Sequence, residues 1–184
     1  KKMKINHLAL KAIYLHEMDR FRRTLTQSLL SPVLTTSLYF IVFGSVIGGY
    51  VEKIDGISYG SYIVPGLLML TLLTQSISNT SFGIFFPKFN GTIYEILAAP
   101  ISTFEVVLAF VGAGATKTLI VSIIIFITSL FFVDVQVKYP LLMIFLLILV
   151  AFTFALFGFL IGLMSSDFEQ MSIIPTLFIT PMVF

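Results

Sequence analysis

Few side chains in this sequence could carry out covalent chemistry. No cysteine is present, which excludes disulfides, thiolate metal sites and cysteine nucleophiles. The two histidines, His7 and His16, lie close to the N-terminus, and no His-Glu-x-x-His motif occurs. The phosphate loop Gly-x-x-x-x-Gly-Lys-[Ser/Thr] is also absent from the sequence. We therefore expect no catalytic residues, no metal site and no ATP site on this chain.

A short polar stripe inside an apolar stretch is a candidate for a transport path. Gln75 and Asn79 are four residues apart, so in a helix they share a face with Thr71. A stripe of this kind can line a polar path, and it can equally hold two membrane spans together by hydrogen bonds. The residues alone leave both interpretations open.

Lys117 is a second candidate for a functional residue, because it is a cation inside an apolar run. It follows Glu105 by twelve residues, or about 18 Å along a straight helix, which is too far for direct pairing. Intramembrane cations usually face a bundle interior or a water-filled cavity and find a partner. We expect one of these surroundings for Lys117, or a contact with Asp134.

The composition of the chain excludes a water-soluble globular fold. Of the 184 residues, 58 % are hydrophobic and 11 % are charged, and the mean hydropathy is +1.04. Soluble domains carry roughly 25 % charged residues. The net charge of +2 gives no reason to expect nucleic-acid binding. The uncharged runs instead predict an all-α, polytopic bundle of transmembrane helices in the lipid bilayer.

The bundle is expected to contain four full spans and an incomplete fifth. The predicted spans cover residues 29–50, 61–86, 104–133, 139–164 and 171–184. Pro175 and Pro181 are expected to interrupt the fifth span. The chain begins without methionine and stops inside an apolar run, so we expect it to be part of a longer protein.

Residues 1–28 are predicted to form a cytoplasmic, interfacial amphipathic helix ahead of the transmembrane domain at 29–184. Seven of the eleven Lys and Arg residues lie among the first 23 residues, which predicts a cytoplasmic N-terminus. An apolar stripe recurs at helical spacing, at Leu10, Tyr14, Met18, Phe21 and Leu25. We expect this stripe to face the lipid acyl boundary, or alternatively a partner protein. Ser31-Pro32 permits a bend into the first span.

Two small-x-x-x-small patterns predict close approach between helices. They are formed by Gly44 with Gly48 and by Gly158 with Gly162. The approach can lie within one chain or across a dimer.

The loop at 87–103 carries the most specific local pattern. Two capping boxes are predicted there, Thr92 with Glu95 and Ser102 with Glu105, since each pairs a hydroxyl residue with a glutamate three positions later. The first box would start a short helix that Pro100 ends. Its apolar residues, Ile93, Ile96 and Leu97, would form a face that docks on a cytoplasmic partner or rests on the membrane surface.

Three segments of the chain resemble the permease subunits of ABC-2 type exporters. They read Tyr-Ile-Val-Pro-Gly-Leu at 62–67, Gly-Thr-Ile-Tyr-Glu-Ile-Leu-Ala-Ala-Pro-Ile-Ser at 91–102 and Ser-Ile-Ile-Pro-Thr at 172–176. The resemblance implies a homodimer of six-span subunits in the inner or plasma membrane. It also implies a separate ABC ATPase that binds ATP and Mg²⁺ and docks on a coupling helix. The partner-coupling residues would be Thr92, Ile93, Tyr94, Glu95, Ile96 and Leu97.

The leading hypothesis is therefore the permease subunit of an ATP-driven exporter, with Gln75, Asn79 and Lys117 as candidates for the translocation path. One alternative is an ion- or proton-driven secondary transporter in which Glu105 and Lys117 titrate. Against it, Glu105 is expected to cap a helix, and no carboxylate lies in the middle of a span. A membrane scaffold without transport activity is the other alternative.

Overall fold

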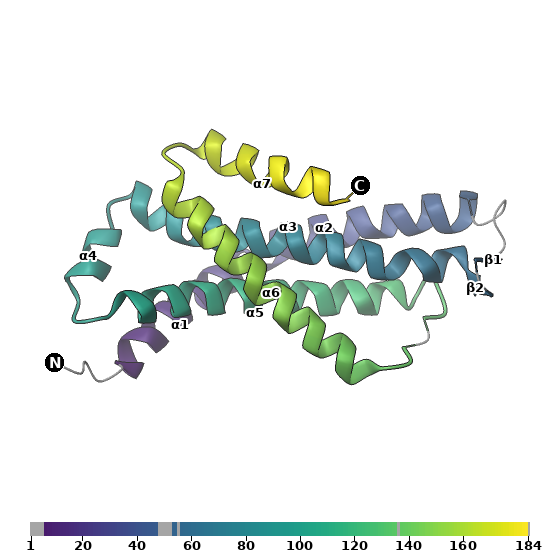
Figure 1. The fold of residues 1–184 in the computed structure, drawn as a ribbon, viewed down its shortest axis with the longest axis horizontal. Helices are drawn as coiled ribbons and strands as arrows, with labels where there is room; N and C mark the ends of the chain where they lie inside the picture. Colours follow the sequence, from purple (N-terminus) through teal and green to yellow (C-terminus); the bar gives the residue numbers. More distant parts are fainter. Residues whose placement is uncertain (1–5, 48–52, 55, 136, 184) are drawn as a thin grey trace.

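The structure, a computed structural model, describes residues 6–47, 53, 54, 56–135 and 137–183, and most of them are helical (Figure 1). The elements in chain order are α1 (His7–Arg23), α2 (Leu25–Tyr39), the π-helical segment η1 (Phe40–Ile47), β1 (Lys53–Ile54), β2 (Ile57–Ser58), α3 (Tyr59–Phe89), α4 (Ile93–Ala98), α5 (Thr103–Ser129), α6 (Pro140–Met164) and α7 (Phe168–Val183). The two short strands form an antiparallel hairpin between the first two long helical segments. The predicted helix bundle is thus observed.

Four helical stretches are long and apolar enough to cross a membrane, and they correspond to the four full spans expected from the sequence, although the third ends at residue 129 and not at 133. They are Leu25–Phe43, Tyr59–Phe89, Thr103–Ser129 and Pro140–Met164. The predicted end of the first span, at residue 50, lies outside the described residues. The helix α7 runs without a break past Pro175 and Pro181, so the expected interruption was wrong. Each proline removes one backbone donor, which a helix in a bundle tolerates.

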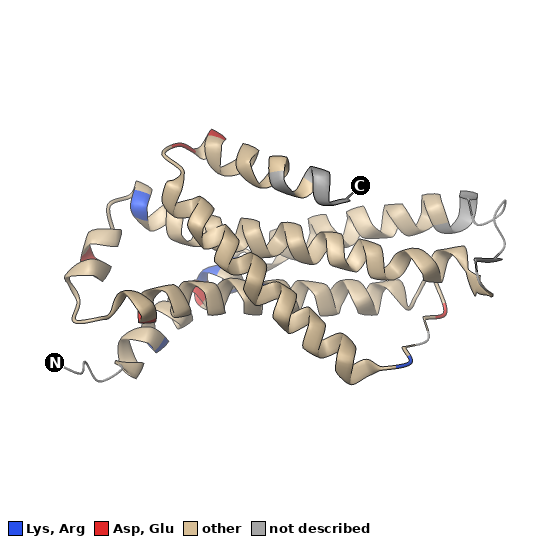
Figure 2. Cartoon of the chain, viewed as in Figure 1, with Lys and Arg blue, Asp and Glu red and all other residues tan. Residues whose placement is uncertain are grey.

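The long helices run alternately up and down between two ends of the bundle (Figure 1). One end carries α4 and the start of α1, and we call it the α4 end. The opposite end carries β1 and β2, and we call it the hairpin end. Helices α2, α3 and α5 follow the long axis, whereas α6 crosses them obliquely. Helix α6 and the middle of α3 carry no charged residue, as Figure 2 shows.

Glycines bring α3 and α6 into backbone contact. A Cβ atom at Gly158 would lie 2.5 Å from the carbonyl oxygen of Ile77, and one at Gly162 would lie 2.5 Å from that of Ser81. The close approach predicted for this pair of glycines therefore occurs within one chain. The other predicted pattern, at Gly44 and Gly48, extends outside the described residues.

The same two helices separate toward the hairpin end. A cavity of about 1160 Å³ opens there between α3 and α6, with mostly apolar walls that include Leu68, Met143 and Leu147. Nearer the middle, Leu72, Ala151 and Ala155 belong to the buried core that joins α3, α5 and α6. The bundle is therefore closed around the glycine contacts and open at the hairpin end.

Replacing Gly158 by alanine tests the backbone contact between α3 and α6. We expect Gly158→Ala to lower the free energy of unfolding by about 1–3 kcal/mol, because the carbonyl of Ile77 cannot rotate away as a side chain could. The matched control is Gly112→Ala, since a Cβ atom at Gly112 meets nothing within 4 Å. Thermal unfolding in detergent measures both variants, and equal melting temperatures would contradict this packing.

Candidate functional site

The helix α1 packs against α5 of its own chain. The hydroxyl of Tyr14 donates to Thr116 Oγ1 at 3.0 Å, and Phe21 is buried against Val121 and Ile125. The apolar stripe predicted on this helix is real, but most of it faces α5 and not lipid or a partner protein. The reason is that α5 offers a buried, continuous helical surface at matching spacing, whereas the stripe was assigned from α1 alone.

The break between α1 and the first span falls at Thr24, and not at Ser31-Pro32 as predicted. The backbone N–H of Thr24 donates to the carbonyls of Arg20 and Phe21, and its hydroxyl bonds to the same two carbonyls. Helix α2 begins one residue later and continues through Pro32. Thr24 therefore ends α1 and sets where α2 starts.

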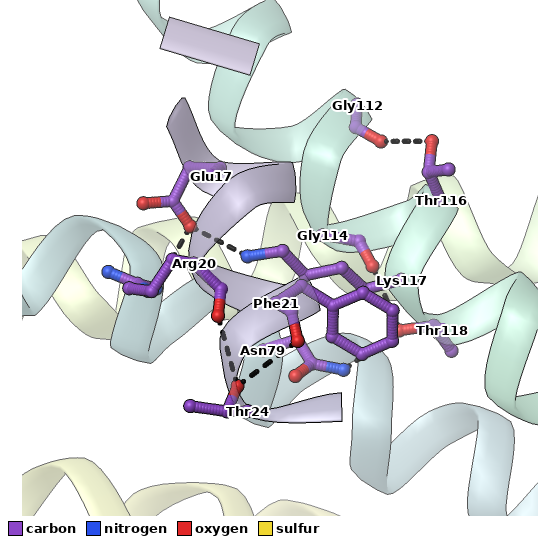
Figure 3. Close-up of polar contacts among 10 residues, drawn as sticks. All are labelled: Glu17, Arg20, Phe21, Thr24, Asn79, Gly112, Gly114, Thr116, Lys117 and Thr118. Atoms are coloured by element: carbon purple, nitrogen blue, oxygen red, sulfur yellow. Dashed lines mark hydrogen bonds and ion pairs between the residues drawn. The ribbon is translucent and has the colours of Figure 1, made fainter. Parts of the chain in front are cut away.

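A buried ion pair joins α1 to α5. Lys117 Nζ lies 2.7 Å from Glu17 Oε2, and the two side chains are only 4 % and 3 % exposed (Figure 3). The guanidinium of Arg20, 28 % exposed, lies 2.9 Å from the same carboxylate oxygen. Lys117 therefore faces the bundle interior, which is one of the surroundings expected for it from the sequence. Its partner is Glu17 and not Asp134, whose backbone carbonyl accepts a hydrogen bond from Ser61.

Helix α3 completes the surroundings of this ion pair. A Cβ atom at Gly83 would lie 3.4 Å from Glu17 Oε2, so a larger residue would crowd the carboxylate. The Arg20 guanidinium lies over the ring of Phe82 at 5.7 Å and over that of Phe86 at 6.0 Å. Three helices, α1, α3 and α5, thus meet around one carboxylate and two cations.

Glu17 was not predicted as a buried residue, although the sequence carries a signal for it. Glu17 lies three residues after Tyr14 and four before Phe21, so it falls on the buried stripe of α1. An acidic residue on an apolar stripe indicates a buried partner of opposite charge. Lys117 is the matching cation in the apolar run of α5.

The second predicted capping box is confirmed and also holds the start of α1. Ser102 Oγ accepts from Glu105 N at 3.3 Å, while Glu105 Oε2 accepts from Ser102 N at 2.7 Å. The other carboxylate oxygen of Glu105 accepts from the backbone N–H of Asn6. Glu105 therefore starts α5 and connects it to the first residues of α1.

The first predicted capping box, Thr92 with Glu95, was wrong. Thr92 makes no side-chain cap bond, because its backbone is already helical at φ −61° and ψ −19°. The turn before it is made by Gly91 at φ +79°, a conformation that glycine adopts readily. The short helix α4 still forms and ends before Pro100, as predicted.

The predicted partner-coupling residues lie on two faces of α4. Ile93 and Ile96 are half-buried and pack against the core of the bundle, together with Ile13 of α1. Tyr94 and Leu97 are 72 % and 65 % exposed. Thr92 and Glu95 are also exposed. The apolar face open to a partner is therefore formed by Tyr94 and Leu97, whereas Ile96, like Ile93, packs against the core.

The predicted path residues do not form one cluster. Asn79 Nδ2 donates to Gln75 Oε1 at 3.3 Å and to Thr118 Oγ1 at 3.5 Å, and so links α3 to α5. Gln75 also lines a cavity of about 260 Å³ between α2 and α3, with Thr35 and Thr71. Lys117 points instead to α1, where it pairs with Glu17.

The spacing Gly-x-Ser-x-Gly, which can mark a serine nucleophile, occurs at 56–60 and was overlooked in the sequence. Ser58 has a structural role here, since its Oγ accepts from Ser61 N at 3.3 Å and starts α3. Both histidines of the sequence lie on α1, which begins at the opposite end of the bundle. Among the described residues, no three His, Cys, Asp or Glu side chains gather as a metal site.

The family model described as ABC-2 type transporter matches residues 9–184. The chain belongs to the ABC-2 type transporter family. It is 38 % identical over 182 residues to an inner membrane transport permease, YadH, of Escherichia coli K12 and of Shigella flexneri. The match covers 99 % of this chain and 71 % of each relative. No solved structure matches the chain significantly.

The family assignment identifies the chain as a membrane permease subunit of an ABC transporter and not as an enzyme. ATP hydrolysis in such a transporter belongs to a separate chain, which agrees with the missing phosphate loop. The ion-driven carrier and the scaffold are therefore not supported.

Lys88 forms polar contacts between the ends of two helices of the permease, and these were not predicted from the sequence. Lys88 Nζ, at the end of α3, donates to the carbonyl oxygens of Leu163 at 2.6 Å and Ser165 at 2.8 Å. These carbonyls lie at the C-terminus of α6, where helices leave acceptors unpaired and favour cations. Lys88 thus fixes the ends of α3 and α6 together beside the loop that carries α4.

Removing one partner of the buried ion pair tests the assignment of Glu17. We expect Lys117→Met to lower the free energy of unfolding by up to about 3 kcal/mol, because Glu17 would keep only Arg20, which is partly exposed to solvent. Asp134→Asn serves as the control and should have no comparable effect. Thermal unfolding of both variants decides between the two carboxylates, and a larger loss in Asp134→Asn would contradict the pairing.

Proposed function

We propose that this permease is the membrane subunit of an ATP-driven exporter and couples to its ATPase through residues 87–103. The ATPase would bind ATP and Mg²⁺ and dock on α4. We further propose that the permease works as a homodimer in an inner or plasma membrane, where its relatives are named as transport permeases.

The single observation that carries this proposal is the division of α4 into two faces. Tyr94 and Leu97 are exposed, while Ile93 and Ile96 hold the helix against the core. Exposed aromatic and aliphatic side chains on a short, fixed helix are suited to docking in a groove of a partner. The helix is followed within five residues by the capping box at Ser102, so a displacement of α4 would act directly on α5.

The lengths of the helices allow the α4 end to extend out of the membrane, and basic residues near this end support a cytoplasmic location. Helix α5, with 27 residues, is about 40 Å long, and α3, with 31, is about 46 Å, against a hydrocarbon core of about 30 Å. Both can therefore extend beyond the core. Helix α1 begins beside the start of α5, and Lys11, near the start of α1, is exposed there. Basic residues in this position favour a cytoplasmic interface with anionic head groups, so we retain residues 1–28 as an interfacial element.

We propose that the transport path runs along the α2–α3 face and includes Gln75. Hydroxyl and amide groups of Ser31, Thr35, Thr71 and Gln75 line the cavity between these two helices. Asn79 would orient Gln75 by hydrogen bonding. Lys117 would contribute to the path indirectly, through the placement of α1.

Adding a charge to the exposed face of α4 tests the docking site. We expect Leu97→Glu to abolish co-purification of the ATPase while the permease still inserts in the membrane, since Leu97 makes no part of the buried core. The matched control is Leu141→Glu, at a position 84 % exposed at the hairpin end. Unchanged co-purification with Leu97→Glu would overturn the docking assignment.

Single-cysteine labelling tests the path, because the sequence contains no native cysteine. We expect Gln75→Cys in reconstituted vesicles to react with a water-soluble, membrane-impermeant maleimide. Ile123→Cys is the control, at an exposed apolar position on α5, and should stay unlabelled. Equal labelling of the two positions would show that Gln75 does not line a water-accessible path.

A further inference from the structure

Polar contacts hold α1 to α5 along much of its length. In order along both helices they join Asn6 to Glu105, Tyr14 to Thr116 and Glu17 to Lys117. The residue numbers of the paired residues increase together along the two segments, so α1 and α5 run side by side in the same direction. The buried side chain of Phe21 extends the contact to Val121 and Ile125.

The first span is held less firmly by its neighbours. Within its most apolar window, 17 % of residues are buried, against 33 % for α3, 56 % for α5 and 33 % for α6. The outward side chains of α2 include Leu30, Leu34 and Leu38, and the cavity of about 260 Å³ separates part of α2 from α3. The start of α2 is set by α1, since the two helices are joined at Thr24 and Ser28 N donates to the Thr24 carbonyl.

We propose that Glu17 and Lys117 are positioning residues that make α1 move with α5, so that a displacement of α4 reaches the first span α2 through α5 and α1. The proposal rests on the proposed function insofar as the ATPase is what moves α4. Separating the pair would leave charges unpaired in an apolar bundle, which is far more costly than losing a surface ion pair. The path from α4 is short, because the capping box of α5 binds both Ser102 and Asn6 through one carboxylate.

Distances between spin labels test this connection without knowledge of the cargo. One pair of labels, at His16→Cys and Leu108→Cys, reports α1 against α5. A second pair, at Leu34→Cys and Ile148→Cys, reports α2 against α6. All four positions are exposed, and the chain has no native cysteine. The permease is measured in complex with its ATPase, with and without ATP plus vanadate, and is diluted with unlabelled permease so that distances lie within one chain.

We expect the α1–α5 distance to be single, narrow and unchanged by ATP plus vanadate, while the α2–α6 distance shifts. In Glu17→Gln the α1–α5 distribution should broaden and the α2–α6 shift should be lost, with the ATPase still bound. Asp19→Asn removes an exposed acid from the same helix and should behave as the unmodified permease. The double charge exchange Glu17→Lys with Lys117→Glu should restore both readouts.

A Glu17→Gln permease with a narrow α1–α5 distance and an intact shift would overturn the proposal. If Glu17→Gln fails to fold, the charge exchange decides: a folded, ATPase-bound double variant that lacks the shift would also overturn it. Failure of the unmodified permease to bind the ATPase would instead refute the proposed function. The α1–α5 distance can be measured without the ATPase, so failure of this proposal can be distinguished from failure of the proposed function.

Discussion

A charged side chain inside an apolar helix bundle has to be paired, and this constraint determines how α1 joins the bundle of the permease. Lys117 lies far from either end of α5, and Glu17 is the carboxylate that reaches it. The pairing requires α1 to lie along α5, and Gly83 leaves room for the carboxylate on the side of α3. The position of α1 in turn determines where α2 begins. A single ion pair thus connects the N-terminal helix, the first span and the helix that follows α4.

The remainder of the bundle is organised by close packing without charges. Gly158 and Gly162 let α6 touch the backbone of α3, and Lys88 fixes the ends of these helices beside α4. Toward the hairpin end the same helices separate around a large apolar cavity. A displacement of α4 would therefore act first on the tightly packed region of α3 and α6. Movement of these two helices relative to each other is easiest toward the hairpin end. This division suits a transporter that is driven from one side and opens toward the other.

Much of this arrangement followed from the sequence because it depends on local chemistry. Runs without charge determine where the long helices lie, and the spacing of Ser102 and Glu105 determines how α5 begins. What could not be predicted depends on contacts between distant segments. The stripe on α1 was recognised by its period, but its partner could be lipid, another protein or α5, and only the fold brings Thr116 and Lys117 to face it. Which face of α4 points outward was likewise undecided from the sequence, because helical periodicity alone does not say whether Ile96 or Leu97 points to the core.

In the proposed coupling, the exposed face of α4 docks on an ATPase, while its other face belongs to the permease core. Site-specific photo-crosslinking in intact membranes tests it most directly, with a photoreactive amino acid placed singly at Tyr94, Leu97, Ile93 or Ile96. We expect crosslinks to a phosphate-loop ATPase from Tyr94 and Leu97, and crosslinks only within the permease from Ile93 and Ile96. Crosslinks from Tyr94 and Leu97 to lipid alone, with none to an ATPase, would contradict it.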